Sequence, residues 1–172
     1  MRKFKNLLKA QQNDLLAMFP DIEKVIAVEE TNTYKFLAIS VFDRWLNQED
    51  GIRLLSNVPP EEQAERDAKL NSFSERLIQE TELINFTIKG RWSKSRISFR
   101  EFLSINAKQA YMSKAPSDVG SNFFFKVAIP ELEALYFESW DDTNVFYLRD
   151  EKTADLIESW ARSCGLYCLS KW

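Results

Sequence analysis

The chain has 172 residues, of which 45% are hydrophobic and 28% charged, and its 26 acidic and 23 basic residues give a formal charge of −3. This length and composition are typical of a single globular domain, residues 1–172, and not of a disordered chain. The chain contains no histidine, which excludes Ser-His-Asp and Cys-His catalysis and histidine zinc ligands, and so disfavours an enzyme.

In the first part of the chain, apolar residues recur at the spacing of an amphipathic helix. Residues 3–19 place their apolar side chains close to a helical period, and Pro20 ends this helix. Residues 25–28 and 34–42 are short apolar runs separated by a turn. They are compatible with a hairpin, but the apolar stripe of the second run favours a helix over residues 34–46.

The middle of the chain begins with its clearest helix. Pro60 suits a first helical position, and the acidic residues that follow it favour the positive end of the helix dipole. This helix is predicted to run to about Asn85. Residues 86–89 then alternate like a strand, and residues 99–112 return to helical spacing. Residues 115–122 form a loop, which is the best candidate for an internal boundary.

The last third of the chain predicts an antiparallel sheet with one helix. We expect strands at residues 123–129, 132–140, 145–148 and 167–169, with a helix beginning at Asp150 or Thr153 and ending near Cys164. Gly165 follows that helix in the position that favours a C-terminal cap. This β-β-β-α-β order, after a mostly helical part over residues 1–114, predicts an α+β fold with the sheet part at residues 123–172.

An acidic surface is predicted on the C-terminal hairpin, with a tryptophan as an aromatic anchor. Its residues are Glu131, Glu133, Glu138, Trp140, Asp141 and Asp142. A negative field of this kind attracts basic surfaces and speeds their association. The alternative interpretation is a soluble edge hairpin that its charges protect from aggregation.

A basic segment without an acidic residue lies in the middle of the chain. It contains Lys89, Arg91, Trp92, Lys94, Arg96 and Arg100, and Phe99 is a second aromatic residue within it. Cations interleaved with aromatic rings are typical of nucleic-acid binding, in which the charges contact phosphates and the rings stack on bases. An acidic protein partner and a plain solvated turn remain as alternatives. The sequence pI of about 5.2 argues against a dedicated nucleic-acid binder.

Carboxylates near the C-terminus suggest a third kind of site. Glu138, Asp141, Asp142 and Asp150 are oxygen ligands of the type that Mg²⁺ and Ca²⁺ use, and Lys152 completes a loose nuclease-like spacing. No calcium loop, phosphate-binding glycine loop or dinucleotide motif is present. We therefore expect neither a bound metal nor a cofactor.

The remaining features concern location. The basic N-terminus is not followed by the apolar segment of a signal peptide, and no segment approaches the roughly 20 apolar residues of a membrane span. Two cysteines, Cys164 and Cys168, are too few for a disulfide framework and are interpreted as buried reduced thiols. We therefore expect a cytoplasmic protein without a membrane partner.

These observations lead to three hypotheses about function. The leading one is a non-enzymatic protein-binding protein that blocks a basic partner, such as a nuclease toxin or a defence enzyme, through its acidic face. No motif of a known family is recognised in the sequence, and only its size, acidity and lack of catalytic motifs are in keeping with small toxin-immunity proteins and phage-encoded inhibitors. The alternatives are a nucleic-acid-binding module that uses residues 89–100 and a metal-dependent phosphodiesterase that uses the C-terminal carboxylates.

Overall fold

The computed structural model describes residues 2–90, 96–113 and 124–170. The helices are α1 (Lys9–Met18), α2 (Ile22–Ile26), α3 (Gln48–Leu55), α4 (Pro60–Glu80), α5 (Ile105–Met112) and α6 (Thr153–Ser163), with a 3-10 turn η2 (Pro130–Leu132). The strands are β1 (Phe4–Asn6), β2 (Lys35–Ser40), β3 (Ile84–Lys89), β4 (Arg96–Phe102), β5 (Lys126–Ile129), β6 (Ala134–Glu138), β7 (Thr143–Leu148) and β8 (Tyr167–Ser170). In this part of the chain, no helix combines the length and the apolar character needed to cross a membrane.

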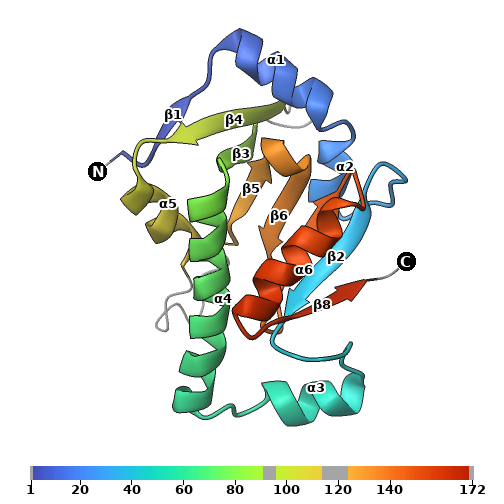
Figure 1. The fold of residues 1–172 in the computed structure, drawn as a ribbon. Coiled ribbons are helices and arrows are strands. Elements are labelled where there is room, and N and C mark those ends of the chain that lie inside the picture. Colours follow the sequence, from blue (N-terminus) through green and yellow to red (C-terminus); the bar gives the residue numbers. More distant parts are fainter. Residues whose placement is uncertain (1, 91–95, 114–123, 171–172) are drawn as a thin grey trace.

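The strands form one antiparallel sheet that is central to the fold (Figure 1). Its order is β1-β4-β3-β5-β6-β7-β2-β8, so the four strands from the first 114 residues and the four strands from the last third are neighbours in a single sheet. The predicted α+β class is confirmed. The first part of the chain is less helical than its spacing predicts, and the candidate boundary at residues 115–122 lies outside the described residues.

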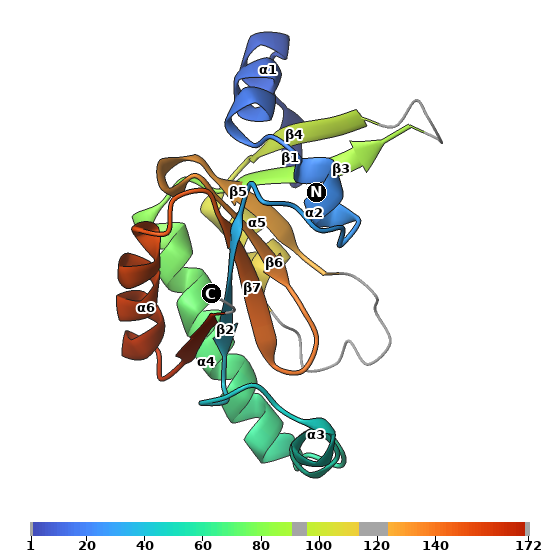
Figure 2. The same ribbon diagram turned by 90° about the vertical axis from the view of Figure 1, so that its right-hand side faces the viewer.

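Helices cover both faces of this sheet. One face, here called the α4 face, packs against α4, α5 and α6, and the other, the α1 face, packs in part against α1 and α2 (Figures 1 and 2). Successive residues of β6 therefore enter different cores. Tyr136 lies on the α4 face and Leu135 on the α1 face, and both are fully buried. This explains why β6 is an almost continuous apolar run.

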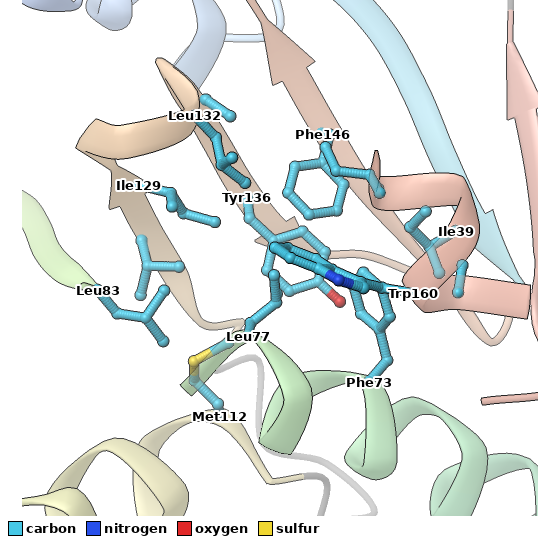
Figure 3. Close-up of a cluster of buried hydrophobic side chains, with 14 of the residues drawn as sticks. Ile39, Phe73, Leu77, Leu83, Met112, Ile129, Leu132, Tyr136, Phe146 and Trp160 are labelled. Atoms are coloured by element: carbon cyan, nitrogen blue, oxygen red, sulfur yellow. The ribbon is translucent and has the colours of Figure 1, made fainter. Parts of the chain in front are cut away.

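An aromatic cluster fills the core of the α4 face. Figure 3 shows Tyr136 among Phe73 of α4, Phe146 of β7 and Trp160 of α6. The rings of Tyr136 and Phe146 are stacked with centroids 4.3 Å apart, and Phe73 meets both rings edge-on. Offset and edge-to-face contacts of this kind add to the stability that aromatic burial itself provides.

Helix α4 begins as its sequence predicts and ends earlier. Pro60 occupies the first helical turn and acidic residues follow it, while Leu70, Phe73 and Leu77 form the buried stripe. The prediction that the helix continues to Asn85 is wrong, because residues from Ile84 onward pair with both β4 and β5.

The structure corrects the predicted helix over residues 34–46. This segment contains the strand β2, which lies between β7 and β8. Leu37, Ala38 and Ile39 are buried in succession on both sides of the strand, so the apolar run has the continuous pattern of a central strand. The preceding apolar run, residues 25–28, is also not a strand, because it contains the end of α2 and the turn that follows it.

Two further helices are shorter than predicted because strands precede them. In the segment 3–19 the helix starts only at Lys9, since β1 pairs with β4 before it. In the segment 99–112 the strand β4 continues to Phe102, and the hydroxyl of Ser104 then caps α5 by accepting a hydrogen bond from the backbone N–H of Ala107 at 3.1 Å.

The predicted order of the last third is confirmed. Strands β5, β6 and β7, helix α6 and strand β8 follow one another along the chain. The helix ends at a glycine in the left-handed conformation, because Gly165 has a φ of +72°. Locally encoded signals, namely the turn residues and the glycine cap, determine this part of the fold.

Candidate functional site

The basic segment and the acidic hairpin that the sequence singles out lie at the same end of the strands of the sheet. Lys89 at the end of β3 lies opposite Arg96 at the start of β4, and Lys126 at the start of β5 lies opposite Phe137 near the end of β6. Because β3 and β5 are antiparallel neighbours, the β3–β4 hairpin and the β6–β7 turn project from the same end of the strands. Figure 2 shows that the twist of the sheet carries them apart, so that they extend in different directions.

The most buried residue of the predicted acidic face is Asp142. One carboxylate oxygen accepts a hydrogen bond from Nη1 of Arg66 at 3.0 Å, and the other accepts one from Nε2 of Gln63 at 2.8 Å. The backbone carbonyl of Asp142 accepts a further bond from the N–H of Val41 at 3.3 Å. Asp142 therefore attaches the β6–β7 turn to α4 and to the end of β2, and its carboxylate is not available to a partner.

Arg66 is the centre of the polar network behind this turn. Its Nη1 also donates to the carbonyl oxygen of Leu54 at 2.9 Å, its Nη2 pairs with Glu62, and its guanidinium lies 5.1 Å from the ring centre of Phe42. Burial acts to lower the pKa of Arg66, but the hydrogen bonds to Asp142 and Glu62 outweigh it and raise the pKa above its ordinary value. Arg66 thus stays charged and joins α3, α4 and the turn.

The other acidic residues divide into two groups at opposite ends of β6. Glu131 accepts a hydrogen bond from the backbone N–H of Glu82 at 2.9 Å, and Glu133 pairs with Arg149 at 3.3 Å. Glu138 lies at the far end of the five-residue strand, which at about 3.3 Å per residue separates the groups by roughly 16 Å. The six predicted residues therefore do not form one continuous face.

At the β6–β7 turn, two residues of the predicted face remain exposed. The side chain of Trp140 is 66% exposed, and its ring packs against Phe124 with centroids 4.6 Å apart. Asp141 is exposed next to it, and Glu138 is half-buried where its carboxylate accepts from the backbone N–H of Phe125 at 3.2 Å.

The turn also meets carboxylates that the sequence analysis did not assign to a site. Through Gln63 and Arg66 it is bonded to the first turns of α4, whose glutamates are exposed. Their acidic character was visible in the sequence, but nothing in it links them to a turn about eighty residues away. Of these glutamates only Glu62 is joined to the turn, through its pair with Arg66. We call the exposed residues Glu62, Trp140 and Asp141 the acidic turn surface.

The basic segment is only partly within the described residues. Arg91, Trp92 and Lys94 lie outside them. Lys89, Arg96 and Arg100 point to the α4 face, whereas Phe99 points to the α1 face and is fully buried. Phe99 is therefore a core residue and does not present its ring for stacking on a base.

The proposed group of metal ligands does not converge. Asp142 precedes β7 and Asp150 follows it, so the strand holds them apart. Among the residues that the structure describes, no cluster of three or more cysteine, aspartate or glutamate side chains is arranged to hold a metal ion. This geometry gives no support to the metal-dependent phosphodiesterase.

The two cysteines are half-buried and free. Burial, with a smaller effect from Glu158, raises the pKa of Cys168 to about 12 from its ordinary value of 9.0.

Because each pKa unit changes the thiolate fraction tenfold, alkylation of Cys168 in a Cys164→Ser variant at about pH 8 should be roughly a thousandfold slower in the folded than in the urea-unfolded protein. A mass-spectrometric time course with iodoacetamide measures both rates. Rates within tenfold of each other would contradict the buried thiol.

Similarity to known proteins assigns no role to these residues. No family model matches the sequence. No curated protein gives a significant match, and no solved structure gives one either.

Proposed function

We propose that this chain is a non-enzymatic protein-binding protein that docks onto a basic partner through the acidic turn surface. The observation that carries the proposal is an exposed tryptophan beside exposed carboxylates, on a turn that Asp142 and Arg66 attach to the body of the fold. An inhibitor of the immunity type, which covers the cationic site of a nuclease toxin or another nucleic-acid enzyme, is the form of this function that the charge favours.

Trp140 has the properties of an interface anchor. Tryptophan is enriched among the few residues that dominate binding energy, and most of the Trp140 side chain is accessible. Its ring is also supported from one side by Phe124. A side chain that is already positioned loses less conformational entropy when a partner covers it, which favours affinity.

The charges around Trp140 suit a cationic partner. Glu62 pairs with the buried Arg66. Within the described ranges, Asp141 has no cation at ion-pair distance. An uncompensated carboxylate creates a negative potential that accelerates association with basic proteins and is weakened by salt.

A double substitution tests this surface without disturbing the buried network. We expect Trp140→Ala with Asp141→Asn to weaken binding of the partner at least tenfold, because it removes the anchor and one uncompensated charge. Asparagine tolerates the left-handed conformation of Asp141, whose φ is 62°. The measurement is affinity capture from cells that express the protein, followed by titration of the captured partner.

The matched control is Val28→Ala with Glu29→Gln. Val28 is 84% exposed and Glu29 is exposed beside it, so this pair also removes one apolar side chain and one charge, but at a distant surface. The control should retain the partner with unchanged affinity. A partner that both variants retain equally, or a complete lack of a stoichiometric protein partner, would contradict the proposal.

A further inference from the structure

The α4 face of β1, β4 and β3 presents a polar surface with an excess of positive charge. Register places Asn6 opposite Arg100, Ser98 opposite Thr87, and Arg96 opposite Lys89. Side chains at registered positions point to the same face of a sheet. Ser98 is buried, so we call the other five residues, Asn6, Thr87, Lys89, Arg96 and Arg100, the cationic strand face. It contains three cations and no carboxylate.

The nearest carboxylate of these strands points away from this surface. Glu101 alternates with Arg100 along β4, so it lies on the α1 face. There it pairs with Lys5, its register partner on β1, with 3.0 Å between Nζ and Oε1. The charge of Glu101 is therefore matched by Lys5 and does not neutralise the cationic strand face.

The described arginines on β4 and near the start of β1 form no ion pair with a carboxylate, in contrast to the other described arginines. Of the nine described arginines, six form ion pairs with carboxylates, namely Arg44, Arg53, Arg66, Arg76, Arg149 and Arg162. The remaining three are Arg2, Arg96 and Arg100, and all three belong to β4 or directly precede β1. Within the described part of the chain, uncompensated guanidinium groups thus gather at one edge of the sheet.

Neutral groups hold the cations of this face in place. Nε and Nη2 of Arg100 donate to Oδ1 of Asn85 at 2.9 and 2.5 Å, and the guanidinium lies 4.2 Å from the ring centre of Phe4. The amine of Lys89 donates to Oδ1 of Asn6 at 3.1 Å. Hydrogen bonds to amide oxygens orient a cation without cancelling its charge, so these side chains remain available to an anion.

Buried groups behind Arg100 make its position firm. Asn85, which is 1% exposed, donates from Nδ2 to the hydroxyl of Tyr111 at 2.7 Å, and that hydroxyl accepts from the backbone N–H of Lys126 at 3.2 Å. Burial raises the pKa of Tyr111, so it stays a neutral phenol and adds no negative charge. Burial, and to a smaller extent the charge of Arg100, lowers the pKa of Lys126.

We infer that the cationic strand face binds the phosphate backbone of a nucleic acid. Lysine, arginine, hydroxyl and amide side chains are the groups that proteins use for phosphate contacts. Arg96 and Arg100 are four residues apart on β4, about 13 Å at the usual strand rise, so they reach different phosphates. The aromatic ring beside these cations, Phe4, lies against the Arg100 guanidinium and packs on Phe102 and Tyr111. Because this ring is already engaged, binding should depend on salt and not on sequence.

The surroundings favour a nucleic acid over a membrane surface. The exposed aliphatic side chains of Leu103 and Ile105 lie beyond the other end of β4. At the usual strand rise Leu103 is about 23 Å from Arg96 and about 10 Å from Arg100, and it points to the α1 face. Ile88 is exposed on the opposite face of the hairpin. Membrane-surface binding combines basic residues with apolar side chains on one surface, and the cationic strand face does not provide that combination.

Salt-dependent binding of oligonucleotides tests the inference. We expect the intact protein to bind a labelled single strand of about 20 nucleotides and the corresponding duplex at about 50 mM salt, and to lose affinity steeply towards about 200 mM. Lys89→Gln with Arg96→Gln should weaken binding at least tenfold. It should also make the slope of log K against log salt shallower by about 1.5, because two phosphate contacts are lost. Fluorescence anisotropy measures both quantities.

The matched control is Lys35→Gln with Lys152→Gln, which removes the same charge from exposed positions elsewhere. It should leave affinity within twofold of the unsubstituted protein, and circular dichroism should show that both variants fold. Arg96→Gln alone, at an exposed position, serves if the double variant does not fold. Equal losses in variant and control, no binding at low salt, or binding to phosphatidylserine-rich vesicles without binding to oligonucleotides would each overturn the inference.

Discussion

Asp142→Asn should lower the free energy of unfolding by about 3 kcal/mol, because it breaks a buried ion pair from one side. The side chains of Asp142 and Arg66 are each 8% exposed, so the remaining guanidinium loses a charged partner that water cannot replace. Arg66 keeps Glu62 and the carbonyl of Leu54, which holds the expected loss at the lower end of the usual range. Urea unfolding followed by circular dichroism measures the change.

The neighbouring residue provides a matched control for this experiment. Asp141 also has a positive φ, 62° against 51° for Asp142, but its side chain is exposed. Asp141→Asn should therefore change stability by less than about 0.5 kcal/mol, as surface substitutions do. Asparagine suits the left-handed conformation at both positions, so equal effects of the two substitutions would show that the pair with Arg66 contributes no more than an exposed carboxylate does.

Substitutions at Asp142 cannot test binding by the acidic turn surface, because they also affect stability. Reversing the charge of Asp142 together with those of Glu138 and Asp141 would disturb the fold as well as the surface. Loss of binding in such a variant would therefore not identify a binding site. Restricting the binding test to Trp140 and Asp141 separates the two effects. The predicted role of Asp142 in contacting a partner is replaced by a role in positioning the turn.

Phe73→Ala should lower the free energy of unfolding by about 4 kcal/mol, within the range for truncating a buried phenylalanine. Phe73 is 0% exposed, and its ring meets Tyr136 and Phe146 edge-on with centroids 5.9 and 6.1 Å away. The substitution removes these contacts and leaves a cavity between α4 and the sheet, which rigid strands cannot close. Thermal and urea unfolding of the purified variant measure the loss.

Two companion variants establish that the cavity is the cause. Phe73→Leu retains much of the volume and should cost less than half as much as Phe73→Ala. Ile52→Ala, on α3, removes a side chain that is 64% exposed and should change stability by less than about 0.5 kcal/mol. A loss below about 1 kcal/mol for Phe73→Ala would contradict the central place of this ring in the core.

The elements that could be predicted from the sequence are those with local signals. Pro60 and the acidic residues after it mark the start of α4, and Gly165 marks the end of α6. The turn at Asp141 and Asp142 separates β6 from β7. Each signal acts over a few residues, through backbone conformation or the helix dipole, so it operates in the same way whatever the rest of the chain does.

Elements without such signals depended on their neighbours. The apolar run around Leu37 has the spacing of a helix as well as of a buried strand, and pairing with β7 and β8 decides for the strand. In the same way, β1 is only three residues long and exists because β4 offers it an edge. Short strands are stabilised by long-range pairing, which periodicity within a window does not reveal.

The candidate sites, like the secondary-structure elements, were only partly predictable from local sequence. Composition and local pattern identified an acidic hairpin and a basic segment, and the lack of histidine narrowed the chemistry available to the chain. Only the tertiary structure decided that Asp142 is paired inside the fold, that Glu62 of α4 is joined to the β6–β7 turn through Arg66, and that the described arginines without a carboxylate partner lie on or near β1 and β4. The physical reason is that charge is a property of a residue, whereas burial and pairing are properties of what the fold places around it.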